Sequence, residues 1–146
     1  MQGDLIFWPI VVMVLATLLI YVRLIKVKIR ELKAGRVNME RRGIHEDAWG
    51  ESVMLINNNI RNQFELPVLF YVLAFALWAV HAVRWEALVA ASLFVLSRIV
   101  HAWIHISSNE VPARRRAFTV GWYLLALMAL LVAWELGKRA LGYGPV

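Results

Sequence analysis

The chain has 146 residues, 61% of them hydrophobic, and its mean hydropathy is +0.62. These values exclude an ordinary soluble domain and leave room only for four membrane spans and short connections. The net charge of +6 does not indicate nucleic-acid binding, because the bases lie beside the apolar runs, where lipid headgroups attract them. The chain has no cysteine, so disulfides, a thiolate nucleophile and cysteine-based metal sites are excluded.

Four apolar runs predict an all-α, polytopic membrane protein whose single domain, 1–146, is a bundle of four transmembrane helices. The spans are expected at about residues 5–27, 52–83, 87–106 and 112–137. An acidic N-terminus precedes the first run, which indicates a retained span rather than a cleaved signal peptide. The first helix is expected to continue outward through the basic segment 26–33, with Gly35 as a plausible break.

Amides and charges dominate the beginning of the second span. Asn58, Asn62 and Glu65 recur there at helical spacing. Arg61 stands four residues before Glu65, so these two side chains can pair on one side of a helix. Pro67 follows and predicts a local kink. The stretch is either a solvated helix end with one salt bridge or a polar face directed at a bundle interior or a ligand.

The third span carries Arg98, His101 and His105 at a spacing that places them on one stripe of a helix. The two histidines and Glu65 would together form a metal trio. Histidine near a membrane interface more often forms hydrogen bonds, and no second acidic ligand lies nearby. We therefore expect no metal site.

The fourth helix is expected to begin after a turn in which Asn109 or Ser108 caps it, with Pro112 in its first turn. Three consecutive arginines, 114–116, follow at this positively polarised helix end. They repel one another unless lipid phosphate, an acidic side chain or an anionic ligand compensates. Arg115 lies about 100° round the helix from its predecessor, so it is expected to serve lipid phosphate or a neighbouring chain.

The bases are distributed unevenly between the two sides of the membrane. Eleven flank the first and third connections, at 23–42 and 114–116, whereas three lie on the other side. This asymmetry predicts that both connections are cytoplasmic. The unusual polar residues of three helices then lie at one depth, which indicates a polar pocket; the alternative is a set of independent end groups that reach the lipid headgroups.

The order and spacing of three short motifs resemble those of the MAPEG family, the membrane-associated proteins in eicosanoid and glutathione metabolism. The motifs are Asn62-Gln63-Phe64-Glu65 followed by Pro67, then Arg98-Ile99-Val100-His101, and then Pro112-Ala113-Arg114. The resemblance spans nearly the whole chain. It implies a homotrimer that binds glutathione as co-substrate between neighbouring subunits, at the cytoplasmic end. It also implies a multi-pass protein of the bacterial-type group, in the bacterial inner (cell) membrane.

The resemblance also implies roles for individual residues. Arg114 matches the arginine that stabilises the thiolate. Residues matched to glutathione binding are Asn58, Arg61, Asn62, Glu65, Arg98, His101 and, loosely, Lys28 or Arg30. Glutathione-type members carry arginine where Asn58 stands, so Arg61 either replaces it or pairs with Glu65.

Two functions are compatible with this pattern. The first is a glutathione-dependent, or otherwise thiol-dependent, transferase or peroxidase that acts on lipophilic electrophiles reaching the site from the bilayer. The second is a non-catalytic membrane trimer of the same fold that binds lipid or an anion. Nothing in the sequence indicates a hydrolase, because no nucleophile elbow is present.

Overall fold

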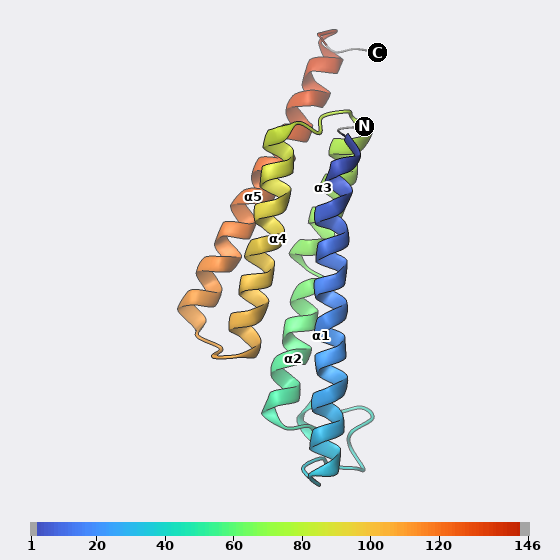
Figure 1. The fold of residues 1–146 in the computed structure, drawn as a ribbon, viewed down its shortest axis with the longest axis vertical. Helices are drawn as coiled ribbons and strands as arrows, with labels where there is room; N and C mark the ends of the chain where they lie inside the picture. Colours follow the sequence, from blue (N-terminus) through green and yellow to red (C-terminus); the bar gives the residue numbers. More distant parts are fainter. Residues whose placement is uncertain (1–2, 144–146) are drawn as a thin grey trace.

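The structure, a computed structural model, describes residues 3–143, and over that range the chain forms helices, turns and loops (Figure 1). Its elements are η1 Gly3–Ile6, α1 Phe7–Lys33, η2 Glu46–Ala48, α2 Glu51–Gln63, α3 Leu66–Ala79, α4 Trp85–Ile106 and α5 Val111–Ala140. The segments long and apolar enough to cross a membrane are Gly3–Lys33, Glu51–Ala79, Trp85–Ile106 and Val111–Ala140. The expected all-α, four-helix membrane architecture is confirmed.

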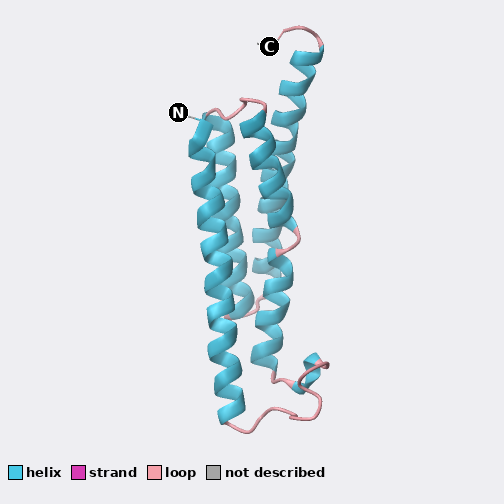
Figure 2. Cartoon of the chain, turned by 90° about the vertical axis from the view of Figure 1, so that its right-hand side faces the viewer, coloured by secondary structure: helices cyan, strands magenta, loops and turns pink. Residues whose placement is uncertain are grey.

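The helical segments run side by side, and the chain passes from one end of the bundle to the other with each (Figures 1 and 2). The beginning of α1, the turn between α3 and α4, and the end of α5 lie at one end, called here the terminal end. The connections 34–50 and 107–110 lie at the opposite end. We call this the basic end, because most of the Lys and Arg residues flank these connections.

The first helical segment is longer than a bilayer requires. Gly3–Lys33 has 31 residues, which corresponds to roughly 46 Å of helix against about 30 Å of hydrocarbon. The basic part of α1 therefore has the length to project beyond the hydrocarbon, as the sequence suggested for 26–33. The chain leaves the helix through Gly35, whose φ of +68° is a left-handed conformation that glycine adopts without a Cβ clash.

The second span is broken rather than only kinked. The helix α2 ends at Gln63, and α3 begins at Leu66 with Pro67 in its first turn. Glu65 lies in the break, with φ −103° and ψ −102°. Proline lacks an N–H and its ring crowds the preceding turn, so the helix is interrupted before Pro67. The backbone carbonyl of Asn62, freed by this break, accepts a hydrogen bond from Nη2 of Arg98 at 3.1 Å.

The main hydrophobic core lies toward the terminal end, between α1, α3, α4 and α5. Phe70 of α3 stacks on Phe94 of α4 with ring centroids 4.7 Å apart, and both side chains are fully buried. Close approach of α5 to α4 depends on Gly121, because a Cβ there would lie 3.0 Å from Oγ of Ser97. The helices α4 and α5 are thus a tightly packed hairpin along much of their length.

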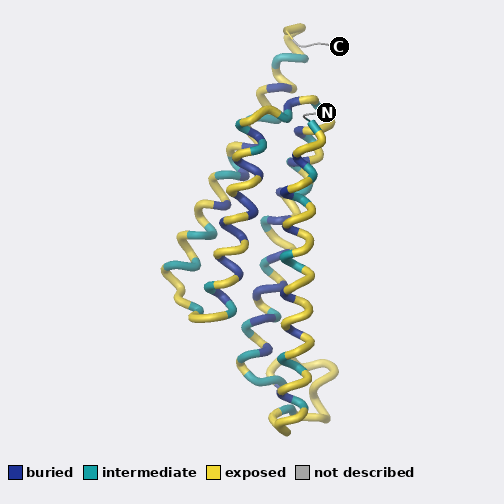
Figure 3. Tube along the Cα trace, viewed as in Figure 1, coloured by how far each residue is buried: buried dark blue, intermediate teal, exposed yellow. Residues whose placement is uncertain are grey.

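Toward the basic end the bundle opens. The helices α4 and α5 diverge from α1 and α2 (Figure 1). The second core cluster accordingly consists mainly of α1 and α2 residues, and α4 contributes Ala102 and Ile106 to it. Buried positions accordingly follow the inner faces of the helices, while their outer faces are exposed (Figure 3). The opening leaves one cavity between α2, α4 and α5 and one groove between α1 and α4.

Ion pairs fold the connection 34–50 against the ends of α1 and α2. Arg36 forms two hydrogen bonds of 2.9 Å with the carboxylate of Glu31, which also accepts one from Ser52 at 3.2 Å. This pairing raises the pKa of the Arg36 guanidinium above its ordinary value. Arg41 pairs with Asp47 at 3.0 Å. Arg36 and Arg41 of this connection therefore stabilise the local fold, in addition to any effect on the orientation of the protein in the membrane.

Candidate functional site

A cavity of about 310 Å³ opens between α2, α4 and α5 at the basic end. We call it the polar pocket. Its lining consists of Asn62, His101, Val111, Arg114, Arg115 and Phe118. Three residues that the sequence singled out from three different helices, Asn62, His101 and Arg114, thus border one space. Convergence of cationic and amide groups from separate helices is the geometry expected of a binding site for an anion.

Arg98 lies behind the polar pocket and is fully buried. Its Nη2 donates to the backbone carbonyl of Asn62, and its guanidinium carbon lies 5.7 Å from the centre of the Phe118 ring. Its Nε and Nη1 are buried and have no hydrogen-bond partner among residues 3–143. A buried charge without a counter-charge is costly. An anionic ligand that reached these two nitrogens would therefore compensate them.

The two histidines of α4 lie beside this arginine. Nδ1 of His105 is 3.3 Å from Nδ2 of Asn62, and because the amide nitrogen is a donor, the imidazole nitrogen accepts. The rings of His101 and His105 are 5.9 Å apart, and Nδ1 of His101 is buried without a hydrogen-bond partner in the described part of the chain. Within residues 3–143, no carboxylate or further histidine joins them in a cluster suited to a metal ion.

Arg114 is held in the polar pocket by a residue that the sequence suggested for another role. Its Nη1 donates to Oδ1 of Asn109 at 2.7 Å. Asn109 has a positive φ of 51°, and its N–H donates to the carbonyl of Ile104 at 2.8 Å. The expectation that Asn109 or Ser108 caps the helix is wrong, because Glu110 is the N-cap and no side chain caps α5. Asn109 instead orients the guanidinium.

Arg115 also borders the polar pocket, and its expected contact with lipid phosphate or a neighbouring chain stays a prediction. The pocket surrounds the first turn of α5, so two successive side chains with long, flexible stems both reach it. Arg116 is exposed and is not among the lining residues. The cavity is therefore more cationic than the helical spacing indicated.

A second cavity, about 420 Å³, lies on the other side of α2, between α1 and the connection 34–50. We call it the loop cavity. Lys28 and Arg61 line it, and Nζ of Lys28 lies 4.7 Å from the centre of the Trp49 ring. Arg61 pairs with Glu46 and donates through Nη1 to Oδ1 of Asn58 at 3.4 Å. The expected Arg61–Glu65 pair is absent among the described residues, because α2 ends between them.

The predicted site residues thus fall into separate groups within one chain. Asn62, Arg98, His101 and Arg114 gather around the polar pocket, whereas Lys28 and Arg61 line the loop cavity. Asn58, Glu65 and Arg30 are exposed and line neither space. Sequence reasoning missed Asn109, Phe118 and Trp49, which contact or orient the predicted residues. In the sequence, these three residues are distinguished only by their position close to a turn or to a cationic helix end.

These features define a polytopic α-helical membrane protein with a cationic pocket at one end of its bundle. The model of the MAPEG family matches residues 6–134 of the chain. The protein therefore belongs to the MAPEG family. No curated protein and no solved structure gives a significant match to the chain.

Proposed function

We propose that the protein is a glutathione-dependent, or otherwise thiol-dependent, transferase or peroxidase that acts on lipophilic electrophiles. MAPEG membership supports this proposal, because the family includes enzymes of this kind. The observation that carries it is the polar pocket, in which Arg114 and Arg115 border a space with no carboxylate in its lining. An anionic thiol ligand supplies the negative charge that such a pocket lacks.

In this proposal the guanidinium groups of Arg98 and Arg114 have different roles. Arg98 is buried with two nitrogens unpartnered, and it suits a fixed carboxylate or peptide group of the ligand. Arg114 lies at the beginning of α5, where the helix N–H groups add to its positive field. A fixed cation in a site of low water content favours the thiolate over the thiol and so lowers the pKa of the ligand's thiol.

The proposed reaction needs no covalent intermediate on the protein. The thiolate sulfur forms a bond to an electrophilic carbon, the leaving group departs with the bonding electrons, and the thiol proton passes to water. With a lipid hydroperoxide, the thiolate attacks the terminal oxygen, the O–O bond breaks, and the lipid alkoxide leaves and takes up a proton to become the alcohol. The thiol is thereby oxidised to a sulfenic acid. A second thiol molecule attacks the sulfenic sulfur, which releases water and yields the disulfide. In both cases Arg114 acts chiefly on the charged sulfur, so it affects rate more than binding.

We infer a homotrimer in which the complete site is shared. The loop cavity and the polar pocket lie on different sides of α2 and both carry basic residues. In a cyclic trimer, one subunit's loop cavity can meet the next subunit's polar pocket. Lys28 and Arg61 of one chain would then face Asn62 and Arg98 of another. Native mass spectrometry in mild detergent should give the mass of three chains; monomers or dimers alone would contradict the inference.

We further propose that the basic end is cytoplasmic and that the protein resides in a bacterial inner membrane. The support is the excess of bases flanking the connections 34–50 and 107–110. Because the chain has no cysteine, Arg42→Cys and Leu141→Cys each introduce a single thiol. A membrane-impermeant maleimide added to intact cells should label the cysteine at 141 and not the one at 42. The reverse pattern would refute the orientation.

A non-catalytic trimer that binds lipid or an anion is the second candidate. One observation favours it: Arg61 is engaged with Glu46 and so does not replace the arginine that glutathione-type members carry at the position of Asn58. Glutathione-dependent turnover of an aryl halide and of a lipid hydroperoxide by the purified protein separates the two candidates. Turnover that is strongly lowered in Arg114→Leu supports the enzyme; glutathione binding without turnover of either substrate supports the alternative.

A further inference from the structure

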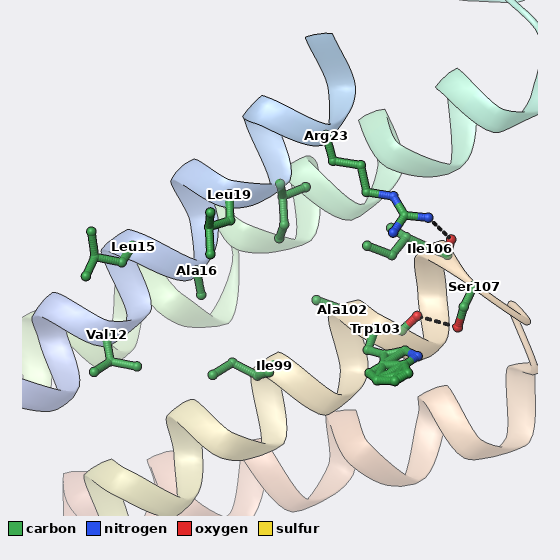
Figure 4. Close-up of a pocket in the computed structure, with 11 residues that line it drawn as sticks. Val12, Leu15, Ala16, Leu19, Arg23, Ile99, Ala102, Trp103, Ile106 and Ser107 are labelled. Carbon is green, nitrogen blue, oxygen red and sulfur yellow. Dashed lines mark hydrogen bonds between the residues drawn. The ribbon is translucent and has the colours of Figure 1, made fainter. Parts of the chain in front are cut away.

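An apolar groove of about 640 Å³ lies between α1 and α4 at the basic end, apart from the polar pocket. Its lining consists of Val12, Leu15, Ala16, Leu19, Ile20, Arg23, Ile99, Ala102, Trp103, Ile106 and Ser107 (Figure 4). The helix α4 separates the two spaces, since His101 borders the pocket and Ile99 borders the groove. Positions two apart point about 200° from each other round a helix.

The groove has the length of one bilayer leaflet. Its α1 wall extends from Val12 to Arg23, which corresponds to about 16 Å of helix. Half of a hydrocarbon core measures about 15 Å. The side chains along it belong to two membrane-spanning segments, and Leu19 and Trp103 are 68% and 62% exposed. In a membrane, this surface meets acyl chains rather than water.

A cation stands where the groove reaches the membrane interface. Nη2 of Arg23 donates to the carbonyl of Ile106 at 3.0 Å, across the mouth of the groove (Figure 4). This bond fixes the guanidinium at the mouth and occupies one of its five N–H donors. Ser107 donates to the carbonyl of Trp103 at 2.7 Å, so its hydroxyl closes the end of α4 rather than competing for the cation.

The same face of α1 continues as a basic stripe beyond the groove. Arg23, Lys26 and Arg30 are spaced by three and four residues, in line with Ala16 and Leu19 of the groove. The three basic side chains are exposed, and none forms a salt bridge within residues 3–143. The face is thus apolar at the depth of the hydrocarbon and cationic at the depth of the headgroups.

We propose that the groove binds one acyl chain of an anionic phospholipid, whose phosphate group contacts Arg23 at the mouth. The apolar length, the anchored guanidinium and the basic stripe match the two chemical halves of such a lipid. A second copy of this chain fits less well, because the lining of the groove holds no carboxylate that could pair with a second basic stripe. The bound lipid fills the space where α4 diverges from α1, and so supports the wall that carries Arg98 and His101 on its other side.

The test is native mass spectrometry of the protein released from nanodiscs that contain equal amounts of phosphatidylglycerol and phosphatidylcholine. Wild-type protein should retain phosphatidylglycerol in at least five-fold excess. Arg23→Gln should reduce this excess to near unity while lipid is still retained. Ala16→Phe, which places a ring in the groove, should reduce retention of both lipids. The matched controls, Arg116→Gln and Ala133→Phe, lie outside the groove and should behave as wild type.

Four outcomes would overturn the proposal. Equal retention of both lipids by wild type, or an unchanged excess in Arg23→Gln, would show that no headgroup site exists there. A change in subunit number in Ala16→Phe, with lipid retained, would identify a second copy as the occupant. A raised KM for a lipophilic electrophile in Ala16→Phe, with lipid retained, would identify the substrate.

If Ala16→Phe does not fold, the thermal stability of Arg23→Gln tests the same site. Arg23 is exposed, so Arg23→Gln should fold normally. Added phosphatidylglycerol should raise the melting temperature of wild-type protein and of Arg116→Gln, and it should raise that of Arg23→Gln much less. An equal rise in all three proteins would contradict the assignment of Arg23.

Discussion

The two ends of the bundle use buried charge in different ways. At the terminal end, a cavity of about 170 Å³ is lined by charges of both signs, Arg84, Glu86 and Glu135 among them. The carboxylate of Glu135 lies 2.7 Å from Nζ of Lys138 and 3.9 Å from Nη2 of Arg84. At the basic end, the lining of the polar pocket includes arginines and no carboxylate.

This difference separates a structural cluster from a binding site. Glu135 and its partners join α5 to the α3–α4 turn, and Arg139 adds a hydrogen bond to the carbonyl of Val80. In this cluster the carboxylate of Glu135 is paired with bases of the same chain, although Oε2 of Glu86 and Nε of Arg139 have no hydrogen-bond partner among residues 3–143. Arg98 and Arg114 form hydrogen bonds to neutral oxygens, those of Asn62 and Asn109, and neither forms a salt bridge within residues 3–143, although Glu65 interacts with Arg98 electrostatically. An anion from outside the chain would therefore find uncompensated positive charge in the polar pocket.

The largest expected effect follows from removal of the cation nearest the proposed sulfur position. Arg114→Leu should lower turnover by roughly a hundred-fold, with a smaller change in thiol affinity, because the charge acts mainly on the reactive thiolate. Steady-state kinetics and the ultraviolet absorbance of the bound thiolate measure both effects.

Two neighbouring arginines provide comparisons for this variant. Arg115→Leu should have an intermediate effect, because Arg115 lines the same pocket. Arg116→Leu is the matched control and should leave turnover unchanged. Full turnover and an unchanged thiolate signal in Arg114→Leu would mean that another arginine stabilises the sulfur.

Arg98→Met tests directly whether the two ends differ. It should weaken glutathione binding by about ten- to a hundred-fold, the value of a charge-assisted contact of roughly 1.5 to 3 kcal/mol. Its melting temperature should not fall, because removal of an unbalanced buried charge offsets loss of the bond to the Asn62 carbonyl.

Glu135→Leu is the counterpart at the terminal end. It leaves the bases around it without their carboxylate, so it should lower the melting temperature and leave glutathione affinity unchanged. Calorimetry and thermal unfolding in detergent measure the two properties. The proposed distinction fails if Arg98→Met melts lower than Glu135→Leu while it still binds glutathione.

Much of the architecture could be predicted from the sequence. Four apolar runs and their flanking bases determined the spans, since burial in lipid depends on length and composition more than on specific contacts. The meeting of Asn62, His101 and Arg114 followed from their depth along the helices. These predictions depended on helical periodicity, which the sequence displays directly.

Other features depended on geometry that periodicity does not reveal. The Arg61–Glu65 pair requires a continuous helix, and the break before Pro67 removed it. The contact of Asn109 with Arg114 requires a left-handed backbone at Asn109. The division of the basic residues between the polar pocket and the loop cavity depends on which side of α2 the other helices and the connection 34–50 pack, which helical periodicity does not specify.

Asn58→Arg adds a cation to the basic end. Arg61 is engaged with Glu46, so an arginine at 58 should tighten glutathione binding by about ten-fold, the lower range for a charge-assisted contact. Met54→Arg, one turn earlier on an exposed face, is the matched control and should have no effect. Equal affinity of Asn58→Arg and wild type would place residue 58 away from the ligand.

The smallest expected effect concerns the orientation of Arg114. Asn109→Gly removes the acceptor and tolerates the positive φ, so turnover should fall by about three- to ten-fold. The KM for the lipophilic substrate should not change. Asn109→Asp restores an acceptor and should recover turnover. A loss of turnover that Asn109→Asp does not recover would show that the side chain acts through the turn rather than through Arg114.

An experimental structure of the protein in a lipid nanodisc with saturating glutathione tests the central claim most directly. The account predicts density for the tripeptide in the polar pocket, with a carboxylate or peptide oxygen at Nε or Nη1 of Arg98 and the sulfur beside Arg114. It also predicts contacts from Lys28 or Arg61 of an adjacent subunit. A polar pocket that holds a lipid phosphate or is closed by an acidic side chain of a neighbouring chain, with no tripeptide, would contradict it.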